Sequence, residues 1–314
     1  MNSSKTLYAG FLAVLMLLTC GVEYVAGQVR VPRPSQKASV MQTVGVTDIT
    51  ITYHRPSVKG RLIWGEAPAE VTVKGEATLD DQNARLKGAP IVPYGHVWRT
   101  GANEATQFTV TDDVHINGQP LKAGTYSLHT IPGQEEWTII FNKDAGQWGS
   151  FAYDAAKDAL RLKVKPKTVA ENQEWLLFSL DPVTENSAQV NIRWEKVSVP
   201  FTVEIKDVTA LALEKARAAV AAAKADDWRT PWQAANFAIQ NKNQEEGMRW
   251  LEQSIKIKPT FQNLSTKAQA LFSAGKKDEA LAVAEQAIQQ GKADKVDTTR
   301  FEKRVAEMKA GKTS

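Results

Sequence analysis

The stretch from Pro93 to Thr106 holds the densest group of side chains that could recognise a ligand. The candidate binding residues within it are Tyr94, His96, Trp98, Arg99, Asn103 and Glu104. An arginine presents a planar fork of N–H donors that suits a carboxylate or a phosphate, and Trp and Tyr rings can stack on a sugar. We therefore expect a shaped loop that binds a carbohydrate or a small anionic ligand. In the structural alternative, Arg99 forms an internal ion pair with Glu104 and the aromatic rings pack in the core.

The second candidate is the polar loop from Asn142 to Gly149, which follows a predicted strand. Asn142 and Trp148 are its candidate binding residues, because loops on a rigid β scaffold often carry binding groups. An exposed Trp148 could form a carbohydrate surface together with Trp98 and Trp137. Alternatively, the loop is an ordinary strand connection whose tryptophan packs against the sheet.

Catalytic chemistry has no recognisable local signature in this sequence. Neither His-Glu-x-x-His nor Gly-x-Ser-x-Gly occurs, which argues against zincin and α/β-hydrolase chemistry. The alternative is an acid/base site built from His96 with Glu104 or Asp144, which would make the protein a hydrolase or an isomerase. The four histidines lack the short spacing typical of a zinc site on one element. We assign no catalytic residue and expect no metal and no cofactor.

The composition is that of a soluble globular protein. Of the 314 residues, 43% are hydrophobic and 24% are charged, and the formal net charge is only +4. Lys and Arg are interspersed with Asp and Glu, so the sequence has no basic stripe of the kind that binds nucleic acid. The chain is long enough for two ordinary domains. We therefore expect two compact units and no nucleic-acid partner.

Residues 1–27 have the features of a secretory signal peptide. A lysine precedes an apolar run from Tyr8 to Thr19, and small residues before Gln28 offer a cleavage site. The run is too short to cross the roughly 30 Å hydrocarbon core of a bilayer as a helix, so we expect no membrane span. The protein is expected to be exported to the periplasm or the outer envelope. Lipidation of Cys20 is a less favoured alternative, because a threonine precedes it where lipoprotein signals usually have Gly, Ala or Ser.

Alternating apolar and polar residues predict a β-rich domain over residues 28–206. The predicted strands are Thr47–His54, Gln107–Thr111, Val114–Ile116, Thr125–Ile131, Glu136–Phe141, Leu160–Val164, Trp175–Leu180, Ala188–Trp194 and Phe201–Ile205. The pair Asn117-Gly118 predicts a two-residue hairpin, because both positions of that turn need a positive φ. Short strands without long helices between them favour an antiparallel β-sandwich or a barrel-like domain.

Residues 207–314 are predicted to form a helical region, since they are rich in Ala, Glu, Lys and Gln with helical spacing. Within it, Trp232 to Ile255 resembles Ser265 to Ile288 at an offset of 33 residues. A repeat of this length with a helix pair in each copy is typical of tetratricopeptide-like repeats, whose concave surface holds a peptide or another protein. The fold class is therefore α+β, with a protein partner expected for the helical tail. The alternative is a helical cap that only covers the β domain.

Motifs spread over the β-rich region carry a resemblance to a known family. They are Arg55-Pro56-Ser57-Val58-Lys59-Gly60-Arg61, Ile63-Trp64-Gly65, Val92-Pro93-Tyr94-Gly95, Val97-Trp98-Arg99-Thr100-Gly101-Ala102-Asn103-Glu104-Ala105-Thr106, Ala123-Gly124-Thr125-Tyr126-Ser127-Leu128, Glu136-Trp137-Thr138 and Phe141-Asn142-Lys143. The pattern resembles a family of exported bacterial proteins, domain of unknown function 2911, over roughly Pro34 to Phe201. The resemblance implies export but supplies no catalytic residue. The family pattern passes almost directly from Gly65 to Val92, so residues 66–90 are an insertion that could reshape the candidate site.

These observations lead to one hypothesis and two alternatives. In the leading hypothesis the protein is a non-catalytic envelope module, whose β domain binds a small polar or carbohydrate ligand near Arg99 and whose helical tail engages a protein partner. The first alternative is the acid/base enzyme described above. The second is a structural scaffold, in which the β domain only carries the helical repeats.

Overall fold

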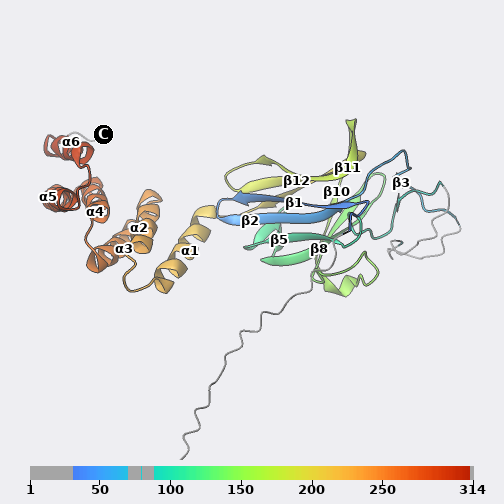
Figure 1. The fold of residues 1–314 in the computed structure, drawn as a ribbon, viewed down its shortest axis with the longest axis horizontal. Coiled ribbons are helices and arrows are strands. Elements are labelled where there is room, and N and C mark those ends of the chain that lie inside the picture. Colours follow the sequence, from blue (N-terminus) through green and yellow to red (C-terminus); the bar gives the residue numbers. More distant parts are fainter. Residues whose placement is uncertain (1–30, 70–78, 80–87, 312–314) are drawn as a thin grey trace, which may run out of the picture. The chain divides into compact units, whose positions relative to one another are not determined.

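The computed structural model describes residues 31–69, 79 and 88–311. The predicted signal segment, Cys20 and most of the insertion therefore lie outside the described residues. The described residues from Ser35 onward belong to one compact unit. In this unit the described strands all precede the described α-helices along the chain (Figure 1). This order confirms the predicted α+β class.

The described strands lie between Gln36 and Glu204. They are β1 (Gln36–Val44), β2 (Thr47–Arg55), β3 (Trp64–Gly65), β4 (Val92–Pro93), β5 (Thr106–Val110), β6 (Val114–Ile116), β7 (Gln119–Leu121), β8 (Gly124–Ile131), β9 (Trp137–Asn142), β10 (Asp158–Val164), β11 (Lys167–Val183) and β12 (Ser187–Glu204). A short 3-10 helix, Ala155–Lys157, precedes β10.

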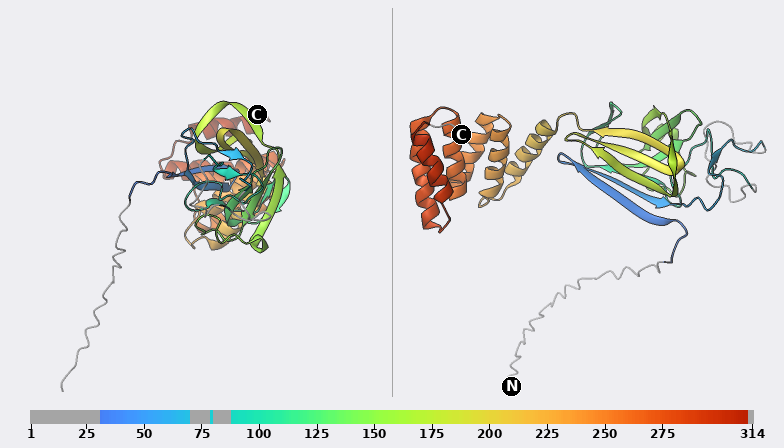
Figure 2. Two further views of the ribbon diagram at one scale, coloured as in Figure 1. Left: turned by 90° about the vertical axis from the view of Figure 1, so that its right-hand side faces the viewer. Right: turned by 90° about the horizontal axis from the view of Figure 1, so that it is seen from above.

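Two antiparallel sheets enclose a single hydrophobic core. The larger sheet has the order β1-β2-β5-β8-β9-β10, and the smaller has the order β11-β12-β6-β7. Ile49 and Ile51 of β2 and Val190 and Ile192 of β12 belong to the same buried cluster, so both sheets contribute to it. Figures 1 and 2 show the long strands of the two sheets gathered around this core. The arrangement is an antiparallel β-sandwich, as the alternating pattern predicts.

The β domain differs from the sequence prediction in several parts: β1, β3 and β4 are additional strands, β11 begins at Lys167 instead of Trp175, and two predicted strands are joined. Strand β1 was not predicted, because it lies at a sheet edge and most of its side chains are exposed, so its apolar alternation is weak. The predicted strands Ala188–Trp194 and Phe201–Ile205 belong to one long strand, β12, apart from Ile205. A β-bulge follows the first of these two predicted segments. Glu195 has a φ of 53°, and the register between β12 and β11 shifts there.

The hairpin between β6 and β7 has the predicted turn. Asn117 and Gly118 have φ values of 46° and 83°, as a type I′ turn requires. The Asn117 side chain also accepts a hydrogen bond from the backbone N–H of Thr202 at 2.7 Å, and its own N–H donates to the Thr202 carbonyl at 2.9 Å. The turn therefore also fixes the end of β12 against this hairpin.

A short parallel pair, β3 with β4, joins the two ends of the insertion. The N–H of Val92 donates to the carbonyl of Ile63 at 2.8 Å, and the N–H of Tyr94 donates to Gly65 at 2.7 Å. The chain therefore leaves the β domain and returns to it at adjacent points.

The helical region contains two helix pairs that match the predicted repeat. The helices are α1 (Val208–Ala222), α2 (Arg229–Gln240), α3 (Gln244–Ile257), α4 (Phe261–Ser273), α5 (Lys277–Ala293) and α6 (Thr299–Lys309). Gly247 of α3 and Ala280 of α5 stand 33 residues apart, and both are buried. A side chain at Gly247 would place its Cβ 2.6 Å from Ile239 Cγ1, so glycine permits the close approach of α2 and α3.

The first helix is attached to the β domain by both apolar and polar contacts. Val208 and Leu211 pack against the sandwich core. Lys215 donates to Asp112 at 2.7 Å and to the carbonyl of Val46 at 3.0 Å. The change from strand to helix occurs at residue 207, as predicted, but these contacts cross it. The division into domains at this residue therefore stays a prediction.

Candidate functional site

The loop that carries Arg99 has an unusual backbone. Thr100 and Asn103 have φ values of 53° and 59°, in the left-handed region that costs a non-glycine residue about 1–2 kcal/mol. Thr100 is fully buried, and its hydroxyl donates to the carbonyl of Trp98 at 3.3 Å and to Thr130 at 3.1 Å. The Thr106 hydroxyl donates to the carbonyl of Thr100 at 2.8 Å. These hydrogen bonds hold the loop in a conformation that its sequence alone disfavours.

Arg99 is held in place by backbone and aromatic contacts. Its Nη1 donates to the carbonyl of Asn103 at 2.7 Å, and its guanidinium lies 5.5 Å from the ring centre of Phe151. Gly149 has a φ of 66°, and a Cβ there would lie 3.1 Å from Arg99 Cζ. The Asn103 side chain in turn donates to the carbonyl of Ser35 at 3.1 Å. Arg99 is therefore positioned before any ligand binds.

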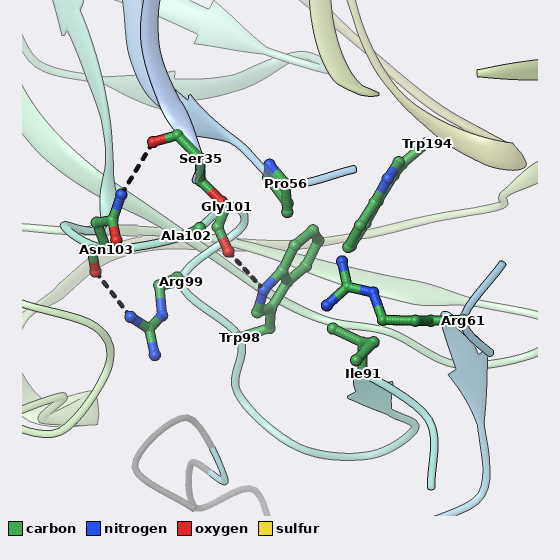
Figure 3. A pocket seen from close by; sticks show the side chains of 10 residues that line it. All are labelled: Ser35, Pro56, Arg61, Ile91, Trp98, Arg99, Gly101, Ala102, Asn103 and Trp194. Carbon is green, nitrogen blue, oxygen red and sulfur yellow. Dashed lines mark hydrogen bonds between the residues drawn. The ribbon is translucent and has the colours of Figure 1, made fainter. Parts of the chain in front are cut away.

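A cavity of about 200 Å³ lies beside this loop (Figure 3). Its lining residues are Ser35, Pro56, Arg61, Ile91, Trp98, Arg99, Gly101, Ala102, Asn103 and Trp194. Arg61 is the second cation, and its guanidinium donates to the carbonyls of Ser57 and Val58. Figure 3 shows Arg61 and Arg99 on either side of the Trp98 ring. Because the residues of the lining that the structure describes include two guanidinium groups and no carboxylate, this lining favours an anion.

A wall of tryptophan rings lies beside the cavity, and two of its members, Trp98 and Trp194, line it. Trp98 stacks on Trp194 with ring centres 5.8 Å apart and an angle of 17° between the rings. Trp64 and Trp137 meet Trp98 edge to face. The N–H of Trp98 donates to the carbonyl of Gly101 at 3.1 Å, whereas the buried N–H of Trp194 has no acceptor among the described residues. A buried donor without an acceptor costs about 1–3 kcal/mol, so the fold keeps the Trp194 ring in this stack at a cost in stability.

The other residues predicted for the first loop have different surroundings. Tyr94 and His96 are half-buried and do not line the cavity beside Arg99. Burial raises the pKa of the Tyr94 hydroxyl, and the carboxylates of Glu66 and Glu195 raise it further. His96 lies beside a much smaller cavity of about 10 Å³. The predicted set is therefore divided, with Trp98, Arg99 and Asn103 at the larger cavity.

Glu104 lies next to a histidine that the sequence analysis did not nominate. Its Oε2 is 3.4 Å from Nδ1 of His54, which is 6% exposed. The backbone of Glu104 also pairs with Trp148, which brings the two predicted loops together. Asp144, the other carboxylate of the acid/base alternative, forms an ion pair with Lys157 at 3.0 Å.

In the second loop, Asn142 has a structural position. It is fully buried, and its amide donates to the carbonyl of Asp154 at 2.9 Å and to the carboxylate of Asp158 at 2.8 Å, while its oxygen accepts from the N–H of Asp144 at 3.0 Å. Trp148 is 51% exposed. Trp98 and Trp137 are buried, so the prediction of one exposed surface shared by the three tryptophans is wrong.

His129 is a buried residue near the site that the sequence analysis did not single out. Its ring nitrogens lie 3.0 Å from the hydroxyls of Ser127 and Ser150, and all three residues are fully buried. Burial lowers the pKa of His129 to about 4, with a further contribution from the charge of Arg99. A serine beside an imidazole can act as a nucleophile in hydrolases, but this group is sealed from solvent. Through its contact with Ser150, which directly follows the second loop, the His129 side chain therefore attaches this part of the chain to β8.

Neither a metal centre nor a membrane helix is found in the described part of the chain. Among the residues with a described placement, no group of three or more His, Cys, Asp or Glu side chains could hold a metal ion. Within the same residues, every helix is too short or too polar to cross a membrane.

Comparison with known proteins gives one match. A family model described as "Protein of unknown function (DUF2911)" matches residues 35–203, which is more than half of the chain. The match includes every residue that lines the cavity beside Arg99. No curated protein and no solved structure matches the sequence significantly.

Proposed function

Because the chain belongs to the DUF2911 family, which is itself of unknown function, we propose a function from the site: the β domain binds a small anionic ligand without catalysing a reaction. The ligand carries a carboxylate or a phosphate, and its remaining part is apolar or ring-shaped, as in a sugar acid. The cavity between Arg61 and Arg99 is the binding site.

The observation that carries this proposal is the preorganised position of Arg99. The loop around it contains two left-handed residues and is secured by buried hydrogen bonds, so the fold maintains a costly conformation. Backbone strain of this kind is common where a side chain must be aimed at a ligand. Since Arg99 is already fixed, little conformational entropy is lost when an anion binds.

The lining and the volume of the cavity indicate the size and the apolar part of the ligand. Pro56, Ile91 and the two stacked tryptophans supply apolar surface. A volume of about 200 Å³ is below the usual range for drug-sized ligands, which begins at roughly 300 Å³. A small organic anion fits this combination better than an oligosaccharide chain.

The same lining favours binding over catalysis. Among the described residues, the lining includes no histidine, carboxylate, cysteine or lysine, and so no side chain that could act as a general base near neutral pH. Arginine keeps its proton under these conditions and serves to bind and orient anions.

The cellular setting is part of the proposal. The signal-like sequence of residues 1–27 supports export to the periplasm or the outer envelope. The helix pairs of residues 229–293 support the engagement of a protein partner by the helical region. The protein would then couple a small envelope ligand to a partner protein.

Thermal unfolding with a panel of sugar acids, peptidoglycan fragments, organic acids and nucleotides tests the binding site. A true ligand at about 100 times its Kd stabilises the fold by about 2.7 kcal/mol, which raises Tm by several degrees. The shift should disappear in Arg99→Gln. It should persist in Lys143→Gln, which removes an exposed cation that does not line the cavity.

Two results would contradict the proposal. If no compound shifts Tm, or if the shift is the same in both variants, the cavity is not the site. Turnover of a panel compound that is abolished by His96→Ala would instead establish the acid/base enzyme.

A further inference from the structure

A second cavity, of about 350 Å³, lies in the helical region. It is lined by Phe261, Ser265 and Gln269 of α4, by Phe301, Arg300 and Arg304 of α6, and by Asp297 just before α6. Phe261 and Phe301 meet edge to face with ring centres 5.6 Å apart, and Phe301 is buried. The two rings therefore form an apolar base between the helices, and the polar side chains surround it. We call this cavity the α4/α6 groove.

The α4/α6 groove contains two cations without a counter-ion. Arg300 and Arg304 are exposed, lie one helical turn apart, and have no ion pair with any described residue. Nearby lysines do have partners: Lys292 lies 3.0 Å from Glu302, and Lys309 lies 3.3 Å from Glu285. The two arginines are therefore the cations of the groove lining that remain available to an anionic partner.

The position of Arg300 in its helix is electrostatically unfavourable. Helix α6 begins at Thr299, so Arg300 lies in the first turn, where the helix dipole favours an anion and disfavours a cation. An anionic partner at this point would interact with the guanidinium and the helix end together.

Among the described residues that line the groove, Asp297 supplies the one carboxylate, and it is already engaged. Asp297 accepts a hydrogen bond from the backbone N–H of Thr299 at 2.9 Å, and hydrogen bonds to Thr299 lower the pKa of its carboxyl. Asp297 thus stabilises the start of α6, and the lining retains a net positive charge from the two arginines.

We propose that the α4/α6 groove binds an acidic, extended segment of a partner protein. Its carboxylates contact Arg300 and Arg304, one apolar side chain packs on Phe261 and Phe301, and Gln269 hydrogen-bonds to its backbone. The groove is lined from α4 and from α6, and the hydroxyl of Ser265 and the amide of Gln269 can hydrogen-bond to a peptide backbone, which suits a peptide chain better than a small anion. This inference rests on the partner binding proposed above for the helical region, and it does not depend on the ligand proposed for the cavity beside Arg99.

Fluorescence anisotropy with a labelled peptide tests the groove. The probe is a short glutamate-rich peptide with one central phenylalanine, and its control replaces every glutamate by glutamine. The purified protein should bind the acidic peptide at least about tenfold more tightly than the neutral one at low ionic strength, and high salt should reduce the difference.

Matched variants assign the binding to the groove. The double change Arg300→Gln and Arg304→Gln should weaken binding of the acidic peptide about tenfold. The changes Lys224→Gln and Lys303→Gln remove the same charge from exposed positions outside the groove lining and should have little effect. Equal weakening by the two double variants, or equal binding of the two peptides, would overturn the proposal.

A further variant addresses the stability of α6. If the arginine variant loses helical circular dichroism, Gln269→Glu places a negative charge in the groove from α4 instead. It should also weaken binding of the acidic peptide, and unchanged binding would overturn the proposal.

Discussion

In the β domain, Arg99 is fixed by a carbonyl, an aromatic ring and a loop with two left-handed residues, whereas Arg300 and Arg304 project from a regular helix. The first arrangement requires buried hydrogen bonds and a close-packed tryptophan wall. The second arrangement requires only that the two arginines lie four residues apart, so that both side chains project from the same face of the helix. Changes at the cavity beside Arg99 should therefore alter stability and binding together, whereas changes in the α4/α6 groove should alter binding alone.

The largest effect on stability is expected from Trp98→Ala. Trp98 is 4% exposed and contacts three other tryptophans, so its removal leaves a large void and should cost about 3–5 kcal/mol of unfolding free energy. Trp148→Ala, at a side chain that is 51% exposed, is the control and should cost much less. Urea denaturation measures both. Similar losses in the two variants would mean that the tryptophan wall does not set the stability of this site.

A slightly smaller effect is expected when the pH falls. The pKa of His129 is about 4 in the folded protein and near 6.5 when unfolded, so the unfolded state binds more protons between these values. The associated stability is fully present above pH 6.5 and is lost as the pH falls toward 4, by about 3 kcal/mol at most.

Unfolding measured at pH 7 and pH 4.5 tests this assignment. The loss between the two pH values should be smaller in His129→Gln than in the unchanged protein. His115→Gln, at a half-buried histidine on β6, is the control. If both histidine variants retain the same loss, another group causes the acid sensitivity.

The smallest of the three effects concerns the helical region. Gly247→Val introduces atoms where a Cβ would already lie 2.6 Å from Ile239 Cγ1 and 3.1 Å from the carbonyl of Ala235, so it should cost about 1–3 kcal/mol. Gly146→Val, in an open loop with nothing within 4 Å, is the control. Thermal unfolding followed by helical circular dichroism compares them. An unchanged midpoint for Gly247→Val would show that α2 and α3 can separate without loss of stability.

The sequence predicts the regular parts of both regions well. Alternation in segments such as β2 and the pair Asn117-Gly118 locate strands and a turn because burial and backbone sterics act locally. The offset of 33 residues likewise predicts the helix pairs. Strand β1 is missed because an edge strand with exposed side chains has little apolar periodicity.

The candidate site is only partly predictable for a different reason. Trp98, Arg99 and Asn103 are found because they lie close together in one unusual stretch. Arg61 and Trp194 reach the same cavity from distant segments, and no local pattern joins them to the loop. His129 is hidden in a strand that is buried on both faces, where a polar residue gives no sign of its partners. These assignments depend on which residues are close together in the folded protein. Local patterns in a single sequence do not show such contacts.

The parallel pair β3 and β4 has an evolutionary consequence. Because it holds Gly65 and Pro93 side by side, a segment of almost any length can be accommodated between them, since doubling a loop adds only about 0.6 kcal/mol of closure entropy. Insertions of new sequence can therefore occur between these two strands without a change in the β-sandwich. This insertion point also lies next to Ile91, a wall of the cavity beside Arg99. A fluorophore or an affinity handle grafted there would report on the pocket from its rim.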